Sequence, residues 1–219
     1  MVTPGRKDVP VIVAIDGPAG AGKSTVGRAV AERLGLEYLD TGAMYRAVTF
    51  AALRRGIDPA DEADVAALAG TVQIAIEASA VVVDGDDAPA ETRGREDTAA
   101  VSAVASNAQV RSELVRRQRE WVDEHAGGVV EGRDIGSVVF PDATLKLFVT
   151  ASPRVRAQRR VAELGGDVAE VEASIIERDR KDSTRTESPL TETDDAVTVD
   201  TTGMSIEDVV DHILGLMPA

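Results

Sequence analysis

A glycine-rich segment between an apolar run and an amphipathic run constrains the fold of this chain more than any other feature. Residues 17–24 read GPAGAGKS and fit the pattern G-x-x-x-x-G-K-[ST]. The preceding run, VIVAI at 11–15, predicts a strand that is buried on both faces. The following residues predict an amphipathic helix over 23–34 that ends at Gly35. Because the N–H groups of a glycine-rich turn at a helix N-terminus can surround an anion, this order predicts a phosphate-binding loop.

Two side chains at the end of this loop suit a nucleotide phosphate. Lys23 would reach the terminal phosphates, and Ser24 could hold Mg²⁺ through its hydroxyl group. The alternative is a glycine-rich turn with no ligand, which the flanking strand and helix make the weaker hypothesis. A phosphate-binding loop does not identify the acceptor, so a GTPase-type switch, a motor-like or transporter ATPase and a small-molecule kinase all remain open.

A second anion site is predicted one helix downstream of the loop. Residues 40–46 read DTGAMYR and are placed where a loop at the carboxyl edge of a parallel sheet should lie. Thr41 offers a hydroxyl group there, and Arg46 offers a guanidinium group about one turn further on. The motif taken alone fits an ordinary helix cap with a surface arginine equally well.

The segment EGRDIG at 131–136 directly follows another predicted strand. An arginine and an aspartate between glycines are poor core residues but suit contact with a ligand. Arg133 could pair with a phosphate through two hydrogen bonds, and Asp134 could accept one from a ribose hydroxyl. The alternative is a local Arg–Asp pair on the surface.

Arginines are dense on three predicted helices even though the chain is acidic. They are Arg111, Arg116, Arg117 and Arg119 on the first, Arg154, Arg156, Arg159 and Arg160 on the second, and Arg178, Arg180 and Arg185 on the third. A solvated charged surface is the usual explanation of such runs. Phosphoryl transfer between two anions is another, because cations must screen their repulsion and stabilise the transferring group. No general base stands out, and a phosphate acceptor, with its second pKa of about 6, would need none.

Strands alternate with helices along the chain, which predicts an α/β domain with a mainly parallel sheet. Thr41 is expected to cap the second helix. Alternating residues over 71–93 predict a small antiparallel insertion, and residues 1–10 a disordered tail. The remaining strands are expected at 129–130, 145–150 and 196–199, and the remaining helices at 43–55, 58–69, 97–125, 152–164, 168–185 and 205–216.

Composition narrows the class of protein further. The 219 residues carry a net charge of -14, which excludes broad sequence-independent binding to nucleic acid and argues against anionic membrane surfaces. The lack of cysteine excludes disulfides, cysteine-ligated zinc, thiol catalysis and iron–sulfur clusters. No apolar run approaches the roughly 18 residues of a membrane span, and no signal peptide is visible. We therefore expect a cytoplasmic monomer with small-molecule substrates.

Five stretches together resemble the bacterial cytidylate kinases, of the nucleoside monophosphate kinase family. They are IDGPAGAGKST at 15–25, LDTGAMYRA at 39–47, VRSELVRRQR at 110–119, GRDIGSVVFPDATLKLF at 132–148 and ERDRKDSTR at 177–185. The resemblance spans residues 11–217, and GRDIGSVVFPDA is the stretch most specific to that family.

The resemblance implies a P-loop NTPase fold over residues 11–219, with a five-stranded parallel sheet wrapped by helices. It adds a small antiparallel monophosphate-binding insertion at about 70–100 and a short lid at about 152–185. The implied reaction is phosphoryl transfer from ATP to CMP or dCMP, with Mg²⁺, in pyrimidine nucleotide metabolism.

Roles for individual residues also follow from the resemblance. ATP would bind Gly17, Pro18, Ala19, Gly20, Ala21, Gly22, Lys23, Ser24 and Thr25, with Arg156 and Arg160 as further contacts from the lid. The acceptor nucleotide would bind Thr41, Arg46, Arg93, Ser102, Arg111, Arg133, Asp134, Arg178, Asp182 and Arg185. The catalytic cations would be Lys23, Arg133 and Arg178. Ser24 stands where some relatives carry glycine, so a direct metal role is allowed but not required.

Two other functions stay open. One is a kinase of the same fold that acts on UMP, shikimate or gluconate, although an acceptor without a phosphate would need a base that the sequence does not show. The other is a GTP-regulated binding module, which would need an Asn-Lys-x-Asp loop. The only asparagine in the chain is Asn107, and it is not in such a loop.

Overall fold

The computed structural model describes residues 10–76, 81–88, 95–184 and 188–218. The first half of the chain forms β1 (Val11–Asp16), α1 (Lys23–Leu34), β2 (Tyr38–Asp40), α2 (Thr41–Arg54), α3 (Glu62–Thr71), β3 (Ile74–Ile76), β4 (Val81–Val83), β5 (Asp86–Ala88) and α4 (Arg95–Ser106). The second half forms α5 (Ala108–Glu124), β6 (Gly127–Glu131), the π-helical turn η2 (Ile135–Val139), β7 (Leu145–Thr150), α6 (Pro153–Leu164), α7 (Val168–Thr184), β8 (Val197–Asp200) and α8 (Ile206–Gly215). The tail predicted at 1–10 lies outside the described residues except for Pro10.

The main sheet has five strands in the order β2-β6-β1-β7-β8, and every neighbouring pair is parallel. This confirms the predicted α/β class and the parallel sheet. Strand β1 lies at the centre and is buried from both sides. Ile15 packs with Val30 of α1 on one face, whereas Ala14 packs with Val48 of α2 and Leu114 of α5 on the other. An unbroken apolar strand is the expected pattern when helices cover both faces of a sheet.

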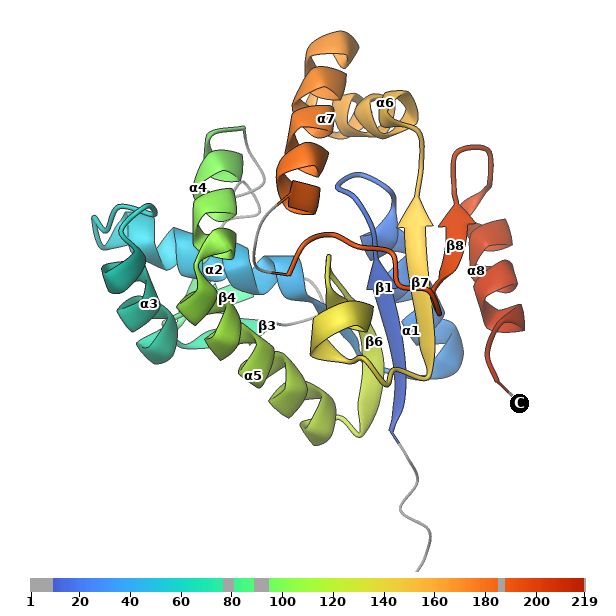
Figure 1. The fold of residues 1–219 in the computed structure, drawn as a ribbon, viewed down its shortest axis with the longest axis horizontal. Coiled ribbons are helices and arrows are strands. Elements are labelled where there is room, and N and C mark those ends of the chain that lie inside the picture. Colours follow the sequence, from blue (N-terminus) through green and yellow to red (C-terminus); the bar gives the residue numbers. More distant parts are fainter. Residues whose placement is uncertain (1–9, 77–80, 89–94, 185–187, 219) are drawn as a thin grey trace, which may run out of the picture.

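The predicted antiparallel insertion is also confirmed. Strands β3, β4 and β5 form a separate three-stranded sheet with antiparallel pairing. Figure 1 shows α3 and this small sheet at the side of the molecule away from β8, while α6 and α7 lie above the ends of β1 and β7. The two attachments therefore lie at different places around the main sheet.

Two details of the sequence-based prediction were wrong. The helix predicted over 97–125 is two helices, because Asn107 interrupts it and its side chain accepts hydrogen bonds from Gln109 N and Val110 N at the start of α5. The cap of α2 is Asp40 and not Thr41, because Asp40 Oδ1 accepts from Ala43 N at 3.1 Å. Either residue type can cap a helix, so composition alone did not distinguish the two positions.

The carboxyl ends of β1, β6 and β7 lie together at one edge of the sheet. A buried carboxylate connects the end of β1 to η2, which follows β6. Asp16, the last residue of β1, accepts hydrogen bonds from Ile135 N at 2.8 Å and Gly136 N at 2.7 Å. Burial raises the pKa of Asp16 to about 6 in spite of these two bonds. Asp16 thereby holds the start of η2 beside the glycine-rich loop.

No helix in the described part of the chain is both long enough and apolar enough to cross a membrane.

Gly17 allows β1 and β7 to approach each other, which leads to a prediction about stability. Its φ is +144°, and a Cβ atom there would lie 2.0 Å from the backbone oxygen of Val149. Gly35 also has a positive φ, +65°, but a Cβ there would meet nothing within 4 Å. We expect Gly17→Ala to lower the free energy of unfolding by about 3 kcal/mol or more, and Gly35→Ala by only about 1–2 kcal/mol. Urea unfolding of both variants tests this, and equal losses would contradict it.

Candidate active site

A cavity of about 210 Å³ lies at the carboxyl edge of the main sheet. The loop after β1, the starts of α1 and α2, the helix α4, the segment between β6 and η2, and the helices α5, α6 and α7 all contribute to its wall. It is lined by Ala19, Gly20, Lys23, Ser24, Asp40, Thr41, Gly42, Tyr45, Arg46, Val101, Ser102, Ala105, Arg111, Glu131, Gly132, Arg133, Asp134, Arg160, Arg178 and Asp182.

Most of the predicted site residues meet in this one cavity. Those among its lining are Ala19, Gly20, Lys23, Ser24, Thr41, Arg46, Ser102, Arg111, Arg133, Asp134, Arg160, Arg178 and Asp182. The predicted residues that do not line it are Gly17, Pro18, Ala21, Gly22, Thr25 and Arg156. Arg93 and Arg185 lie outside the described residues.

The glycine-rich loop brings a buried ammonium group and a hydroxyl group to the cavity. Lys23 Nζ donates to the carbonyl oxygen of Pro18 at 2.9 Å, which holds the side chain along its own loop. Burial and the nearby charge of Arg133 lower the pKa of Lys23. Ser24 Oγ donates to Glu131 Oε1 at 2.7 Å. An anion in the loop would stabilise the charged form of Lys23, because it adds the negative charge that the buried ammonium lacks.

Glu131 ends β6 and connects the two sides of the cavity. Its backbone oxygen accepts from Thr41 Oγ1 at 2.7 Å, and its side chain accepts from Ser24. The other carboxylate oxygen, Oε2, is buried and has no hydrogen-bond partner among the described residues. Burial and the neighbouring Asp40 raise the pKa of Glu131. A buried carboxylate with unused lone pairs is costly unless a donor or a cation completes it.

Carboxylates hold several of the arginines at the acceptor side in place. Asp40 Oδ2 pairs with Arg46 Nη2 at 2.7 Å, so the residue that caps α2 also orients the arginine one turn later. Arg111 of α5 forms a buried pair with Asp134. Asp134 is thus engaged with an arginine, not placed on the surface as the alternative interpretation of EGRDIG required.

Helix α7 reaches the same place through Arg133. Arg133 Nε pairs with Asp182 Oδ2 at 3.1 Å, and its Nη1 donates to Gly132 O at 3.1 Å. Arg178, one turn before Asp182 on α7, has a buried Nε with no hydrogen-bond partner in the described structure. Burial and repulsion from Arg133, Arg160 and Arg46 lower the pKa of Arg178 to about 10. The cluster therefore has more positive charge than its own carboxylates balance, as a site for an anion requires.

Arg156 lies behind the glycine-rich loop and not in the cavity. The residue is 3% exposed, and its guanidinium group donates to Ala151 O at 2.9 Å and to Ala19 O at 3.1 Å. It also pairs with Asp179 of α7 at 2.7 Å. Arg156 supports the loop from outside and links it to α7.

Sequence reasoning missed three polar residues of the cavity wall: Asp40, Tyr45 and Glu131. All three lie inside or next to motifs that were recognised, because Asp40 and Tyr45 belong to DTGAMYR and Glu131 begins EGRDIG. For Glu131 the usable signal was its position directly after the predicted strand at 129–130, whereas the strand that Asp40 ends was not predicted. Acidic residues at the carboxyl ends of parallel strands face the site that such sheets form.

The arrangement offers two anion sites in one cavity. The glycine-rich loop with Lys23 and Ser24 suits a polyphosphate, and the arginine cluster on the other side suits a second phosphate. A site of this kind can bring two anions together and stabilise charge that develops between them.

Comparison with known proteins agrees with this geometry. Residues 13–219 match the sequence profile of the family described as cytidylate kinase. A cytidylate kinase from Streptomyces avermitilis is 47% identical over 213 residues, which cover 94% of this chain and 92% of that protein. A cytidylate kinase from Mycolicibacterium paratuberculosis is 49% identical over 216 residues, which cover 94% of this chain and 95% of that protein.

Solved structures that are much more distant in sequence share the fold. A gluconokinase from Sinorhizobium meliloti superposes with a TM-score of 0.50 at 17% identity, covering 94% of this chain and 91% of that one. This likeness concerns the fold alone. The profile match over nearly the whole chain and the close full-length relatives place this chain in the cytidylate kinase family.

Proposed function

We propose that this chain transfers the terminal phosphoryl group of ATP to CMP or dCMP and releases ADP with CDP or dCDP. One observation supports this reaction above the others. A single cavity is lined both by Lys23 and Ser24 of the glycine-rich loop and by four arginines, namely Arg46, Arg111, Arg133 and Arg178. Membership of the cytidylate kinase family supplies the acceptor, and the cavity supplies the two anion sites that this acceptor needs.

At the donor end, residues 17–25 would bind the phosphates of ATP. The loop glycines allow close approach of the backbone, and Lys23 would contact the terminal phosphates. Arg160 lines the cavity from α6 and would be the lid contact to ATP, while Arg156 would act by holding Ala19 in place. We assign the lid to α6 and α7.

At the acceptor end, Arg46, Arg111, Arg133 and Arg178 would hold the phosphate of CMP. Guanidinium groups suit this task because they pair with phosphate oxygens through two parallel hydrogen bonds and remain charged. Thr41 and Ser102 line the same wall and would contact the nucleotide. Asp182 and Arg185 would face the sugar, and Arg93 and Ser102 the cytosine.

The transfer itself needs little from the protein beyond placement and charge. An oxygen of the CMP phosphate forms a bond to the γ-phosphorus of ATP, and the bond from that phosphorus to the β–γ bridging oxygen breaks. The CMP phosphate has a second pKa of about 6, so no general base is required. Lys23, Arg133 and Arg178 would stabilise the charge on the transferring group, and closure of α6 and α7 over the cavity would exclude water.

The residues around Ser24 fit a magnesium ion. Mg²⁺ takes oxygen ligands from hydroxyl groups, carboxylates, water and phosphates, and Ser24 Oγ lies 2.7 Å from Glu131 Oε1. The orphaned Oε2 of Glu131 gives a further acceptor for a water of the ion. Ser24 and Glu131 would hold the ion, which when bound would neutralise charge on the β- and γ-phosphates of ATP.

The acceptor can be tested with a coupled assay of ADP release. CMP, dCMP, UMP, AMP, shikimate and gluconate would each be offered with ATP and Mg²⁺. We expect kcat/KM for CMP or dCMP to exceed that for every other acceptor by at least about tenfold, because the site holds both a phosphate and a base. Best turnover of AMP, UMP, shikimate or gluconate would rule out this proposal.

Arg133 is expected to act on the acceptor and the transferring group more than on ATP binding. We predict that Arg133→Ala lowers kcat with CMP by about a hundredfold, because one transition-state cation is lost, and leaves KM for ATP within about twofold. Arg180→Ala is the control, because it also removes one arginine, but Arg180 is exposed on α7, pairs with Glu177 and does not line the cavity. An equal rise in both Michaelis constants, with kcat unchanged, would contradict the assigned role.

Glu131 is expected to determine the requirement for Mg²⁺. Glu131→Gln keeps the shape of the side chain and removes its charge. We predict that the Mg²⁺ concentration at half-maximal rate rises about tenfold or more, as is usual when a residue that supports a metal ligand is lost. Titration of Mg²⁺ at saturating ATP and CMP measures this value. A variant with lower kcat but the same dependence on Mg²⁺ would show that Glu131 has only a structural role.

A further inference from the structure

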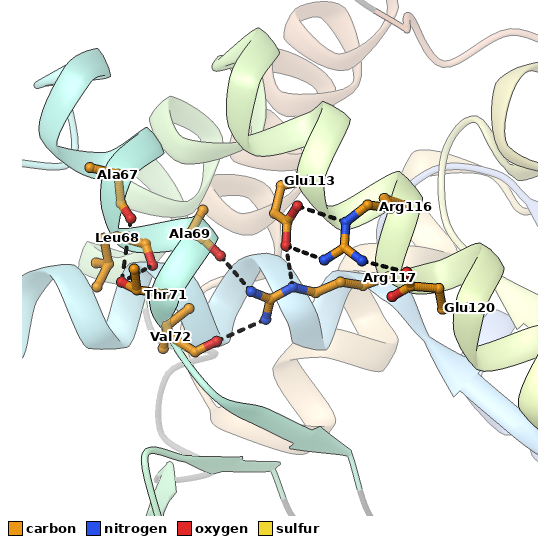
Figure 2. Close-up of polar contacts among 9 residues, drawn as sticks. All are labelled: Ala67, Leu68, Ala69, Thr71, Val72, Glu113, Arg116, Arg117 and Glu120. Carbon is orange, nitrogen blue, oxygen red and sulfur yellow. Dashed lines mark hydrogen bonds and ion pairs between the residues drawn. The ribbon is translucent and has the colours of Figure 1, made fainter.

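Arg117 on α5 is bound to the point where α3 ends and the small sheet begins. Its Nη1 donates to Val72 O at 2.8 Å and its Nη2 to Ala69 O at 2.7 Å, while its Nε donates to Glu113 Oε1 at 2.7 Å. Figure 2 shows the guanidinium group between the end of α3 and Glu113. All three side-chain nitrogens of Arg117 therefore form hydrogen bonds at this one junction. None of the roles proposed above requires these bonds.

The charges at this junction favour the arrangement. The carbonyl groups of the last turn of a helix have no partners within the helix and carry partial negative charge, so a cation there is stabilising. Glu113 also accepts two hydrogen bonds from Arg116, and the two arginines lower the pKa of Glu113 to about 2. Glu113 is thus ionised at any pH near neutrality and keeps the guanidinium plane of Arg117 facing α3.

Arg116 is the natural comparison, because it sits next to Arg117 and bonds the same carboxylate. Its side chain is 53% exposed, against 19% for Arg117, and its other partner is the exposed Glu120. Arg116 bonds Glu113 and Glu120, whereas Arg117 bonds both Glu113 and the carbonyls of Ala69 and Val72, so among the described contacts only Arg117 connects Glu113 to the junction. Substituting each of the two residues in turn therefore separates the effect of losing a charge on α5 from the effect of losing the link to α3.

The other end of α3 is also attached to α5. Asn107, which caps α5, donates from Nδ2 to Glu62 O at 2.8 Å in the first turn of α3. Between these two attachments, α5 carries Arg111, which pairs with Asp134 in the cavity. One helix therefore holds α3 at both ends and supplies a cation to the proposed acceptor site.

The part of the chain that follows α3 returns to the cavity. After α3 it forms the small sheet and then α4, which brings Val101, Ser102 and Ala105 to the cavity wall. A shift at the junction of α3 and β3 would displace this wall relative to Arg111. The donor loop after β1 is attached to other elements and would be unaffected.

We propose that Arg117 is a positioning residue for the acceptor nucleotide. By binding the end of α3, it sets the distance between the wall formed by α4 and the arginine that α5 places in the cavity. This role rests on the proposed CMP kinase activity, and it concerns the Michaelis constant for CMP, not the chemical step.

The test compares Arg117→Gln with Arg116→Gln in the full chain. Each removes one cation that binds Glu113, but only the first releases Ala69 O and Val72 O. We expect Arg117→Gln to raise KM for CMP about fivefold, with kcat and KM for ATP changed less than about twofold. Arg116→Gln should leave all three constants within about twofold of the unsubstituted chain.

Arg117→Lys keeps the proposal testable if Arg117→Gln does not fold. Lysine retains the charge but cannot bond two carbonyls and a carboxylate in one plane, so KM for CMP should rise by less than in Arg117→Gln and the fold should persist. Equal values of KM for CMP in the Arg116 and Arg117 variants, or a matching rise of KM for ATP, would overturn the positioning role. Failure of the unsubstituted chain to phosphorylate CMP would instead overturn the proposed function itself.

Discussion

The cavity depends on holding like charges close together. Burial, together with repulsion from Arg133, Arg160 and Arg46, lowers the pKa of Arg178 to about 10. Individual carboxylates offset part of this repulsion, as Asp40 does for Arg46 and Asp182 for Arg133. These carboxylates do not neutralise all of the positive charge of the arginines, so an anion that enters the cavity would neutralise the rest. A chain of net charge -14 can thus contain a strongly cationic site, because its acidic residues include the partners that keep the arginines in place.

The parallel sheet determines where these charges meet. Three strand ends, those of β1, β2 and β6, bring Asp16, Asp40 and Glu131 to the same edge, and each carboxylate bonds a different element. Asp16 holds η2, Asp40 holds the start of α2, and Glu131 holds Ser24 of α1. The donor loop and the acceptor arginines are therefore joined through the backbone of the main sheet, while α4 and α7 are attached by side chains.

Much of the fold was predictable because its signals are local. The apolar run of β1, the glycine pattern of the loop and the helix start at Ser152–Pro153 all depend on neighbouring residues, and the structure confirms the elements that they predicted. The break at Asn107 was not predicted, because apolar residues continue at helical spacing across it. Its cap bonds to Gln109 N and Val110 N are local, but its contact with Glu62 O comes from a distant part of the chain. Strand β2 was also not predicted, because only the pairing of its three residues with β6 identifies them as a strand.

The candidate site shows the same division between local and distant information. Motifs identified which residues gather in the cavity, but not which carboxylate each arginine contacts, because those partners lie up to 49 positions away, as Asp182 does from Arg133. Arg117 was visible only as one of a run of arginines, and its contacts with α3 distinguish it from Arg116.

The choice of cation also follows from burial. Lys23, buried in the loop, has its pKa lowered, whereas Arg178 in the crowded cluster still has a pKa of about 10. A lysine at position 178 would start from a lower pKa, and the same burial and repulsion would bring that pKa closer to neutrality than the pKa of Arg178. Guanidinium groups are therefore the cations that can be placed side by side before any anion arrives. Lys23, the one lysine among the described residues that line the cavity, lies in the glycine-rich loop, where a polyphosphate bound as proposed would raise its pKa again.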